Sequence, residues 1–266
     1  MSEREGLAWQ IGVWDRISDI YIREIDPRFA PVVDAVVRRA AIEPGESVLD
    51  LGTGTGPVAE KAAEIVGPDG AVTAVDVSPD MLALARGRLA DRPNVTVVEG
   101  RGEEIPADDS SCDVVLASLS LMYVIDLQSA AGEIARVLRP GGRLVGAVWA
   151  GGEECDIVAF QATAGRFAGP PPVTGVGPGA LADPTEFLAQ LDAAGIAASV
   201  EKETLGFDFP DFTSAWDTLA GVTTANLPAD AQQQAKDAVL AAMYPDGDGP
   251  RHFTNVTQFI VGRRGG

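Results

Sequence analysis

The stretch SVLDLGTGTGP, residues 47–57, decides the fold. It begins with an apolar run interrupted only by Asp50, and such a run predicts a buried strand of a parallel sheet. Pro57 closes the stretch and suits the first turn of a helix, where the missing N–H of proline costs nothing. Between strand and helix lie three glycines at alternate positions: Gly52, Gly54 and Gly56. We therefore expect a strand–turn–helix unit whose backbone approaches a ligand closely.

The spacing of these glycines bears on the kind of ligand. They follow the pattern G-x-G-x-G, whereas the dinucleotide-binding turn follows G-x-G-x-x-G. Asp50 would repel a pyrophosphate but suits a cationic amino-acid end. Both observations argue against a nicotinamide-dependent oxidoreductase, although an ordinary tight turn with incidental glycines remains an alternative.

A second acid lies at the end of the next predicted strand. The segment AVTAVDVS, residues 71–78, is apolar and rich in β-branched residues, and Asp76 stands 24 positions after Gly52. An acid at this place can accept both hydroxyls of a ribose. Its alternative role is to cap the following helix, but Ser78, just before Pro79, already suits that position.

Three motifs together resemble the class I S-adenosylmethionine-dependent methyltransferases: LDLGTGTG at 49–56, VDVSPDML at 75–82 and VLRPGGRLV at 137–145. The resemblance implies S-adenosyl-L-methionine as cofactor. It departs from the family at Arg101, where an aspartate usually accepts from the adenine amino group, because arginine cannot accept. Glu103, the backbone around Gly102 and stacking on Arg101 are the candidate adenine contacts. The implied cofactor-binding residues are Asp50, Gly52, Thr53, Gly54, Gly56, Asp76, Val77, Met81, Gly102, Glu103, Ser118 and Tyr21.

The N-terminal segment WDRISDIYIREIDP, residues 14–27, resembles the cap of the branch that methylates quinones and other small molecules. In that branch the segment closes over the cofactor, and Trp14 and Tyr21 match its aromatic positions. The alternative is that both rings only pack a helix onto the core. Residues 9–40 carry an approximate helical stripe, with a second helix predicted from Pro31 to Ala41.

The alternation of strands and helices predicts an α/β fold with helices on both faces of a doubly wound, Rossmann-like sheet. The resemblance implies seven strands, mostly parallel, with an antiparallel last strand between its neighbours. We expect one methyltransferase domain over residues 1–266, with a helical cap at 1–41, a cofactor-binding core at 42–150 and acceptor-side elements at 151–266. Two helices are predicted within 211–245, and the glycine- and proline-rich segment 169–184 is predicted to be a loop or lid.

The predicted reaction is methyl transfer to a small, apolar or aromatic acceptor, on oxygen or carbon. Relatives often carry a histidine pair where Met122 and Tyr123 stand, so the usual general base is absent. Tyr123 and His252 are the candidate catalytic residues, and positioning alone is the other possibility. A cyclase or pericyclase that keeps the cofactor as a structural element is the alternative function. The candidate acceptor-binding residues, each also a candidate for simple core packing, are Trp14, Met122, Phe160, Phe167, Trp216 and Tyr244.

Composition excludes several classes of protein. The 266 residues carry 39 acidic and 20 basic side chains, a net charge of −19, which disfavours binding to nucleic acid. Two distant cysteines and a single histidine offer no metal-ligand spacing. No signal core and no run of about 18 apolar residues is present. We therefore expect a cytoplasmic monomer or homodimer without a metal and without a membrane span.

Overall fold

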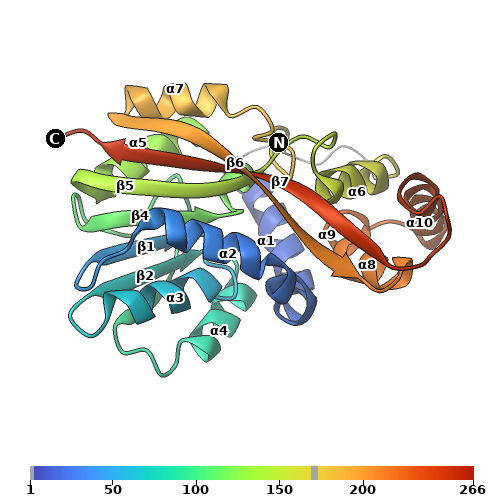
Figure 1. The fold of residues 1–266 in the computed structure, drawn as a ribbon, viewed down its shortest axis with the longest axis horizontal. Helices are drawn as coiled ribbons and strands as arrows, with labels where there is room; N and C mark the ends of the chain where they lie inside the picture. Colours follow the sequence, from blue (N-terminus) through green and yellow to red (C-terminus); the bar gives the residue numbers. More distant parts are fainter. Residues whose placement is uncertain (1–2, 169–172) are drawn as a thin grey trace.

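A seven-stranded sheet forms the centre of the protein (Figure 1). The computed structural model describes residues 3–168 and 173–266. The strand order is β3-β2-β1-β4-β5-β7-β6, and every neighbouring pair is parallel except those that β7 makes with β5 and β6. The predicted fold class, with its antiparallel last strand, is confirmed. The strands are β1 (Ser47–Leu51), β2 (Ala71–Asp76), β3 (Val95–Glu99), β4 (Cys112–Ser118), β5 (Leu138–Trp149), β6 (Ile196–Phe209) and β7 (Arg251–Arg264).

Helices cover both faces of this sheet, as continuous burial of its central strands requires. Helix α2 packs on β4, β5 and β6 and α3 on β1 and β2, whereas α5 and α7 lie together on the other side (Figure 1). The helical segments are α1 (Glu3–Ile20), the π-helical η1 (Tyr21–Ile25), α2 (Asp26–Ala40), α3 (Pro57–Val66), α4 (Pro79–Arg88), the 3-10 helix η2 (Leu121–Tyr123), α5 (Leu127–Val137), α6 (Asp156–Gly165), α7 (Thr185–Ala193), α8 (Phe212–Leu219), α9 (Gly221–Thr224) and α10 (Ala229–Met243).

The long strands β6 and β7 extend past the parallel strands and carry a second group of helices. Figure 1 shows α6, α8, α9 and α10 gathered around this extension, with α1 between them and the parallel part of the sheet. Helix α9 packs against both α6 and α1. The N-terminal helix is thereby placed at the carboxyl ends of β1 and β4, where ligands bind in folds of this kind.

Two predictions about helices need correction, one of a boundary and one of a number. The N-terminal segment is helical from Glu3 and does not restart at Pro31, which lies inside α2; the irregular turn is the π-helical stretch Tyr21–Ile25. The predicted pair of helices within 211–245 is a set of three, because α9 forms a short turn between α8 and α10. In the glycine- and proline-rich segment, residues 173–184 form turns and bends without a helix or strand, and residues 169–172 lie outside the described part.

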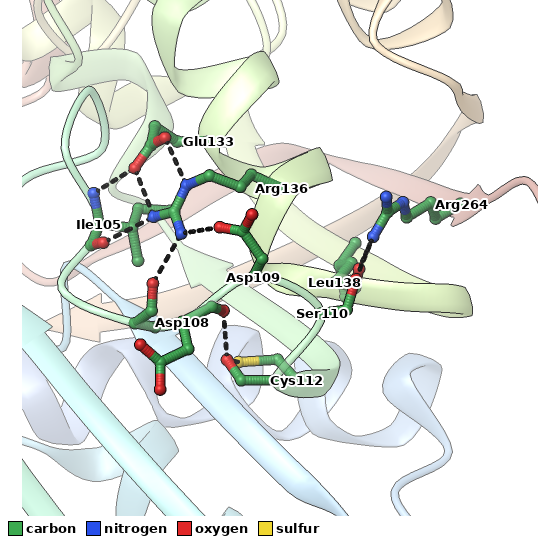
Figure 2. A network of polar contacts seen from close by, with 11 residues as sticks. Ile105, Asp108, Asp109, Ser110, Cys112, Glu133, Arg136, Leu138 and Arg264 are labelled. Atoms are coloured by element: carbon green, nitrogen blue, oxygen red, sulfur yellow. Dashed lines mark hydrogen bonds and ion pairs between the residues drawn. The ribbon is translucent and has the colours of Figure 1, made fainter.

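The loop between β3 and β4 is fixed by one arginine on α5. Arg136 donates to the carbonyl oxygens of Ile105 and Ala107 and pairs with Asp109 and Glu133 (Figure 2). Glu133 in turn accepts from the Ile105 N–H at 2.8 Å. This network holds the chain that follows β3, which supplies one wall of the site described below.

None of the helices among the described residues is both long enough and apolar enough to cross a membrane.

Candidate active site

The turn after β1 is built from glycines in the left-handed region. Gly52 has φ +73° and Gly54 has φ +56°. The Gly52 N–H donates to the Val75 carbonyl at 2.8 Å, so the turn is held against β2. A Cβ on Gly52 would lie 2.3 Å from the Ser120 Cβ, whereas a Cβ on Gly54 would meet nothing within 4 Å. The first glycine therefore permits close packing of protein, and the second leaves open space beside the backbone.

Asp76 joins this turn to the following helix. Its Oδ2 accepts from the Gly54 N–H at 2.8 Å and its Oδ1 from the Ser78 N–H at 3.0 Å. Burial raises the pKa of the Asp76 carboxyl, and these backbone N–H groups oppose that shift. Ser78 caps α4 by accepting from the Met81 N–H, as its position predicts.

Asp50 lies buried beneath the turn. It is 1% exposed, and its Oδ2 accepts from the Thr53 hydroxyl at 2.6 Å and the Ala59 N–H at 3.1 Å. Burial raises its pKa from 3.8 to about 7. Its Oδ2 thus satisfies the start of α3, while its Oδ1 is buried without a hydrogen-bond partner among the described residues. Contact of Asp50 with the cofactor stays a prediction.

A cavity of about 110 Å³ opens between the glycine turn, the strand ends and α1; we call it the strand-end cavity. It brings together nine of the twelve predicted cofactor residues, and Asp50, Thr53 and Gly56 are the three that do not line it. Its walls also contain Tyr123 and Trp14. The nine are Tyr21, Gly52, Gly54, Asp76, Val77, Met81, Gly102, Glu103 and Ser118.

Several residues of this wall escaped the sequence analysis. Gln10 lies one helical turn before Trp14, so the helical period alone was a signal that both face the same way. Ser120 follows Leu119, which has φ +57°, and donates to the Leu51 carbonyl at 2.6 Å. The others lie in apolar runs that carry no local signal: Leu7, Leu51, Val124 and Ile125.

The wall expected to hold adenine contains all three candidates. Arg101, Gly102 and Glu103 line the cavity. The Glu103 Oε1 already accepts from the N–H groups of Ile125 and Asp126, at 2.9 and 3.2 Å. These bonds fix the position of the Glu103 carboxylate at the cavity. A carboxylate can accept a hydrogen bond from an amino group, whereas the guanidinium of Arg101 cannot.

A second cavity, of about 650 Å³, adjoins the first, and we call it the acceptor cavity. The two share Gln10, Trp14 and Tyr123. The Trp14 and Tyr123 rings meet edge to face with centroids 4.7 Å apart, and the Gln10 amide donates to the Tyr123 carbonyl at 2.9 Å. These three residues form a common wall between the cavities.

The helical cap is anchored to the core by two acids. Asp15 of α1 accepts from the Ser78 hydroxyl at 2.6 Å. Asp26 at the start of α2 pairs with Arg88 at 2.8 Å and accepts from the Thr55 hydroxyl. Tyr21 lies between these anchors and Trp14 directly precedes the first, and both line the strand-end cavity. Their predicted role in closing over the cofactor stays a prediction that this placement allows.

The structure separates the remaining acceptor candidates. Met122 lines a small cavity of about 40 Å³ with Trp14 and Tyr123. Phe160 is fully buried among aromatic rings, with the Phe253 centroid at 6.3 Å, and Tyr244 packs on Phe212 at 5.1 Å. Four of the predicted acceptor-binding residues line neither cavity, so the structure does not bring them to the site: Phe160, Phe167, Trp216 and Tyr244.

The two candidate catalytic residues, Tyr123 and His252, lie in different parts of the structure. His252 is exposed on β7, with its Nδ1 2.8 Å from the Asp208 carboxylate, and it lines neither cavity, so the structure does not bring it to the site. Tyr123 lies on the shared wall, and burial raises the pKa of its phenol. Burial also raises the pKa of Tyr21. At neutral pH both hydroxyls stay protonated and act as hydrogen-bond donors or acceptors, not as strong bases.

Comparison with known proteins agrees with this arrangement. Residues 49–146 match the family described as a methyltransferase domain. The ubiquinone/menaquinone biosynthesis C-methyltransferase UbiE of Hahella chejuensis is 38% identical over 112 residues, which are 41% of this chain and 45% of that protein. The chain thus matches less than half the length of this relative.

Solved structures show the fold over a larger part of the chain. The YcgJ protein of Bacillus subtilis superposes with a TM-score of 0.64 at 21% identity and covers 89% of this chain and 99% of its own. The [4+2]-cyclase SpnF reaches 0.58, also at 21% identity, over 88% of this chain and 81% of its own. At such identities the likeness establishes architecture alone. The motifs, the fold and the family match agree: residues 49–146 are similar to the methyltransferase domain family, and the part of the chain that aligns with UbiE is similar to the quinone C-methyltransferases.

Proposed function

We propose that this protein transfers a methyl group from S-adenosyl-L-methionine to a small, largely apolar acceptor. The observation that carries the proposal is the shared wall of Gln10, Trp14 and Tyr123, which separates the strand-end cavity from the acceptor cavity. A two-substrate reaction needs two adjoining sites whose contents meet at one point. Such an arrangement aligns the reacting groups, and alignment alone contributes several kcal/mol to a transfer reaction.

The residues of the strand-end cavity fit this cofactor. Asp76 is placed to accept from the ribose hydroxyls, since its carboxylate lines the cavity at the end of β2. The open space beside Gly54 admits the methionine part, which a side chain there would exclude. Gly102 and Glu103 stand on the wall left for adenine. When bound, the cofactor supplies a methyl group on a positively charged sulfur, already reactive toward a nucleophile.

The protein contributes chiefly position and exclusion of water. Tyr123 offers a protonated hydroxyl at the shared wall, and His252 is remote from both cavities. We therefore expect Tyr123 to orient the acceptor by donating a hydrogen bond. Acceptors that lose their own proton readily suit such a site, because no imidazole lines either cavity among the described residues.

The acceptor itself is proposed from two observations. The walls of the acceptor cavity are mostly apolar, contributed by α1, α6, α9 and residues 176–180. The relatives matched in sequence are named for C-methylation in ubiquinone and menaquinone biosynthesis. A ring with an activated carbon is accordingly the first acceptor to seek, followed by phenols methylated on oxygen.

Two measurements test the proposal. S-adenosylhomocysteine should raise the melting temperature, by an amount that grows with the logarithm of its concentration above its dissociation constant, and NAD should not. Incubation with methyl-deuterated cofactor and a panel of quinones, phenols and isoprenoids should yield a product that gains one labelled methyl in the mass spectrum. An isomer of unchanged mass would instead identify a cyclase, and a melting temperature that responds to NAD alone would overturn the cofactor assignment.

A further inference from the structure

The acceptor cavity has an unusual charge pattern for this protein. Aspartate and glutamate outnumber lysine and arginine by 39 to 20 in the sequence. Among the residues described as lining the cavity, however, there is no carboxylate, and Arg16 is the one charged side chain. The cavity therefore disfavours cations and leaves one fixed positive charge for an anion.

Arg16 stands at the opening of the cavity. It is exposed, on the same helical face of α1 as Trp9 and Val13, which also line the cavity. Its Nη1 lies 3.3 Å from the position that a Cβ on Gly12 would take, so the guanidinium lies back along the helix over this glycine. No carboxylate within the described residues forms an ion pair with it. Its hydrogen-bonding edge is left for a ligand.

The other polar groups of the cavity do not compete for that role. The Gln161 amide donates to the Leu219 carbonyl at 2.7 Å and its oxygen accepts from the Thr223 hydroxyl. Tyr123 lies on the wall shared with the strand-end cavity. The cavity thus combines a mostly apolar lining, a tyrosine on the shared wall and one exposed cation.

We infer that the acceptor is an amphipathic anion: an apolar ring body that bears an ionised acid group, held at the cavity mouth by Arg16. The inference rests on the proposed function, since it names the class of molecule that the acceptor cavity takes. The apolar part lies toward Trp14 and Tyr123, where the methyl group arrives, and the acid remains near water. A partly solvated pair of this kind avoids the desolvation cost of a buried charge and still selects against neutral and cationic analogues.

The test compares two probes with the same ring, 2-naphthol and 2-naphthoate, of which only the second is an anion at neutral pH. Their affinities are measured by calorimetry with the protein saturated in S-adenosylhomocysteine. We expect naphthoate to bind about threefold to tenfold more tightly, the range between an exposed and a partly desolvated ion pair. Arg16→Gln should abolish the difference, and Arg16→Lys should retain part of it.

The matched control is Arg23→Gln, an exposed arginine of the same N-terminal segment that lines neither cavity. It should keep the preference of the unmodified protein. Equal affinity for the two probes, a preference that survives in Arg16→Gln, or no binding of naphthoate to the saturated protein would each overturn the inference. Failure of S-adenosylhomocysteine itself to bind would instead contradict the proposed function, so the two failures are distinguished. An unchanged affinity for S-adenosylhomocysteine in each variant shows that the fold is intact.

Discussion

Asp76→Ala is the most direct test of how the strand-end cavity works. The carboxylate lines the cavity while two backbone N–H groups, of Gly54 and Ser78, fix its orientation. Two ribose hydroxyls donating to a charged acceptor contribute about 1.5–3 kcal/mol each. Burial works against this gain, because it raises the pKa of the carboxyl and so disfavours the charged form that accepts. We therefore expect the loss to correspond to at least tenfold weaker binding, and to more than a hundredfold if both bonds are lost in full.

The assay is calorimetric titration with S-adenosylhomocysteine, which needs no acceptor. Glu99→Ala is the matched control: Glu99 is the register partner of Asp76 on β3, ends that strand in the same way, and lies outside the cavity. Its removal should leave the affinity within about twofold. Asp76→Asn adds a second comparison, because its amide keeps one oxygen but sets its NH₂ against the N–H of Gly54 or Ser78. We expect the affinity of Asp76→Asn for S-adenosylhomocysteine to lie between those of Asp76→Ala and Glu99→Ala.

Unfolding must be followed alongside, since Asp76→Ala also leaves the Gly54 and Ser78 N–H groups without their partner. This loss destabilises the fold by about 1–3 kcal/mol, depending on how far water replaces the carboxylate. The reasoning would be refuted by an Asp76→Ala protein that is folded and binds S-adenosylhomocysteine as tightly as the Glu99→Ala control does. That result would mean that the ribose lies elsewhere than at the end of β2.

Three further predictions concern the turn, the buried acid and the histidine. Gly54→Ala should bind S-adenosylhomocysteine tenfold or more weakly than the unmodified protein. The control Gly45→Ala, with φ +86° and equally open space but away from the cavity, should lose only about 1 kcal/mol of stability. Equal affinities of the two variants for S-adenosylhomocysteine would show that the space beside Gly54 is not used. Asp50 has a raised pKa in the folded protein, so the folded state binds its proton more tightly and the free energy of unfolding falls as pH rises from about 4 to about 7. Chemical denaturation of Asp50→Asn should show a free energy of unfolding that depends less on pH, with up to about 4 kcal/mol less loss over that range. Parallel pH profiles for the variant and the unmodified protein would contradict the raised pKa. His252→Ala should leave the turnover of any methylated acceptor within about twofold, because the imidazole pairs with Asp208 outside both cavities, and a hundredfold loss would place it in catalysis after all.

The sequence was sufficient for the parts of the site that depend on local chemistry. Gly52, Gly54 and Asp76 follow from a strand–turn–helix pattern, since a turn that needs positive φ selects glycine and the end of a neighbouring parallel strand lies at the same sheet edge. The seven-stranded sheet with an antiparallel last strand came from the family resemblance combined with the alternation of elements, and it is confirmed. The roles of Gly52, Gly54 and Asp76 at the cofactor stay predictions, although all three line the cavity at the strand ends.

Orientation was the first thing that the sequence did not reveal. Asp50 and Asp76 each stand at or near the carboxyl end of a strand, yet only Asp76 faces the cavity. Asp50 is drawn inward because the Thr53 hydroxyl and the Ala59 N–H need an acceptor beneath the turn. A one-residue difference in position along a strand reverses the face of a side chain, and the sequence alone does not fix which face is occupied.

Packing between segments far apart in the chain was the second feature that the sequence did not reveal. Phe160, Trp216 and Tyr244 have the composition of an aromatic pocket, but their rings fill the core of the helical group around β6 and β7. Large rings bury the most apolar area when they meet each other, and this gain outweighs exposure in a cavity. Arg16, by contrast, appeared to be an ordinary exposed arginine, and only the position of α1 beside α6 and α9 places it on a cavity wall.

A continuous set of hydrogen bonds links the glycine turn to the cap. The Gly54 N–H donates to Asp76 at 2.8 Å, Asp76 accepts from the Ser78 N–H at 3.0 Å, and the Ser78 hydroxyl donates to Asp15 of α1 at 2.6 Å. Each of these groups is satisfied only while the next one is in place. The acid proposed to hold the ribose is thus connected through a single serine to the helix that carries Trp14. Because Trp14 belongs to the wall between the two cavities, this series of hydrogen bonds runs from the strand-end cavity to the wall that it shares with the acceptor cavity, although Asp15 and Ser78 stand 63 residues apart in the sequence.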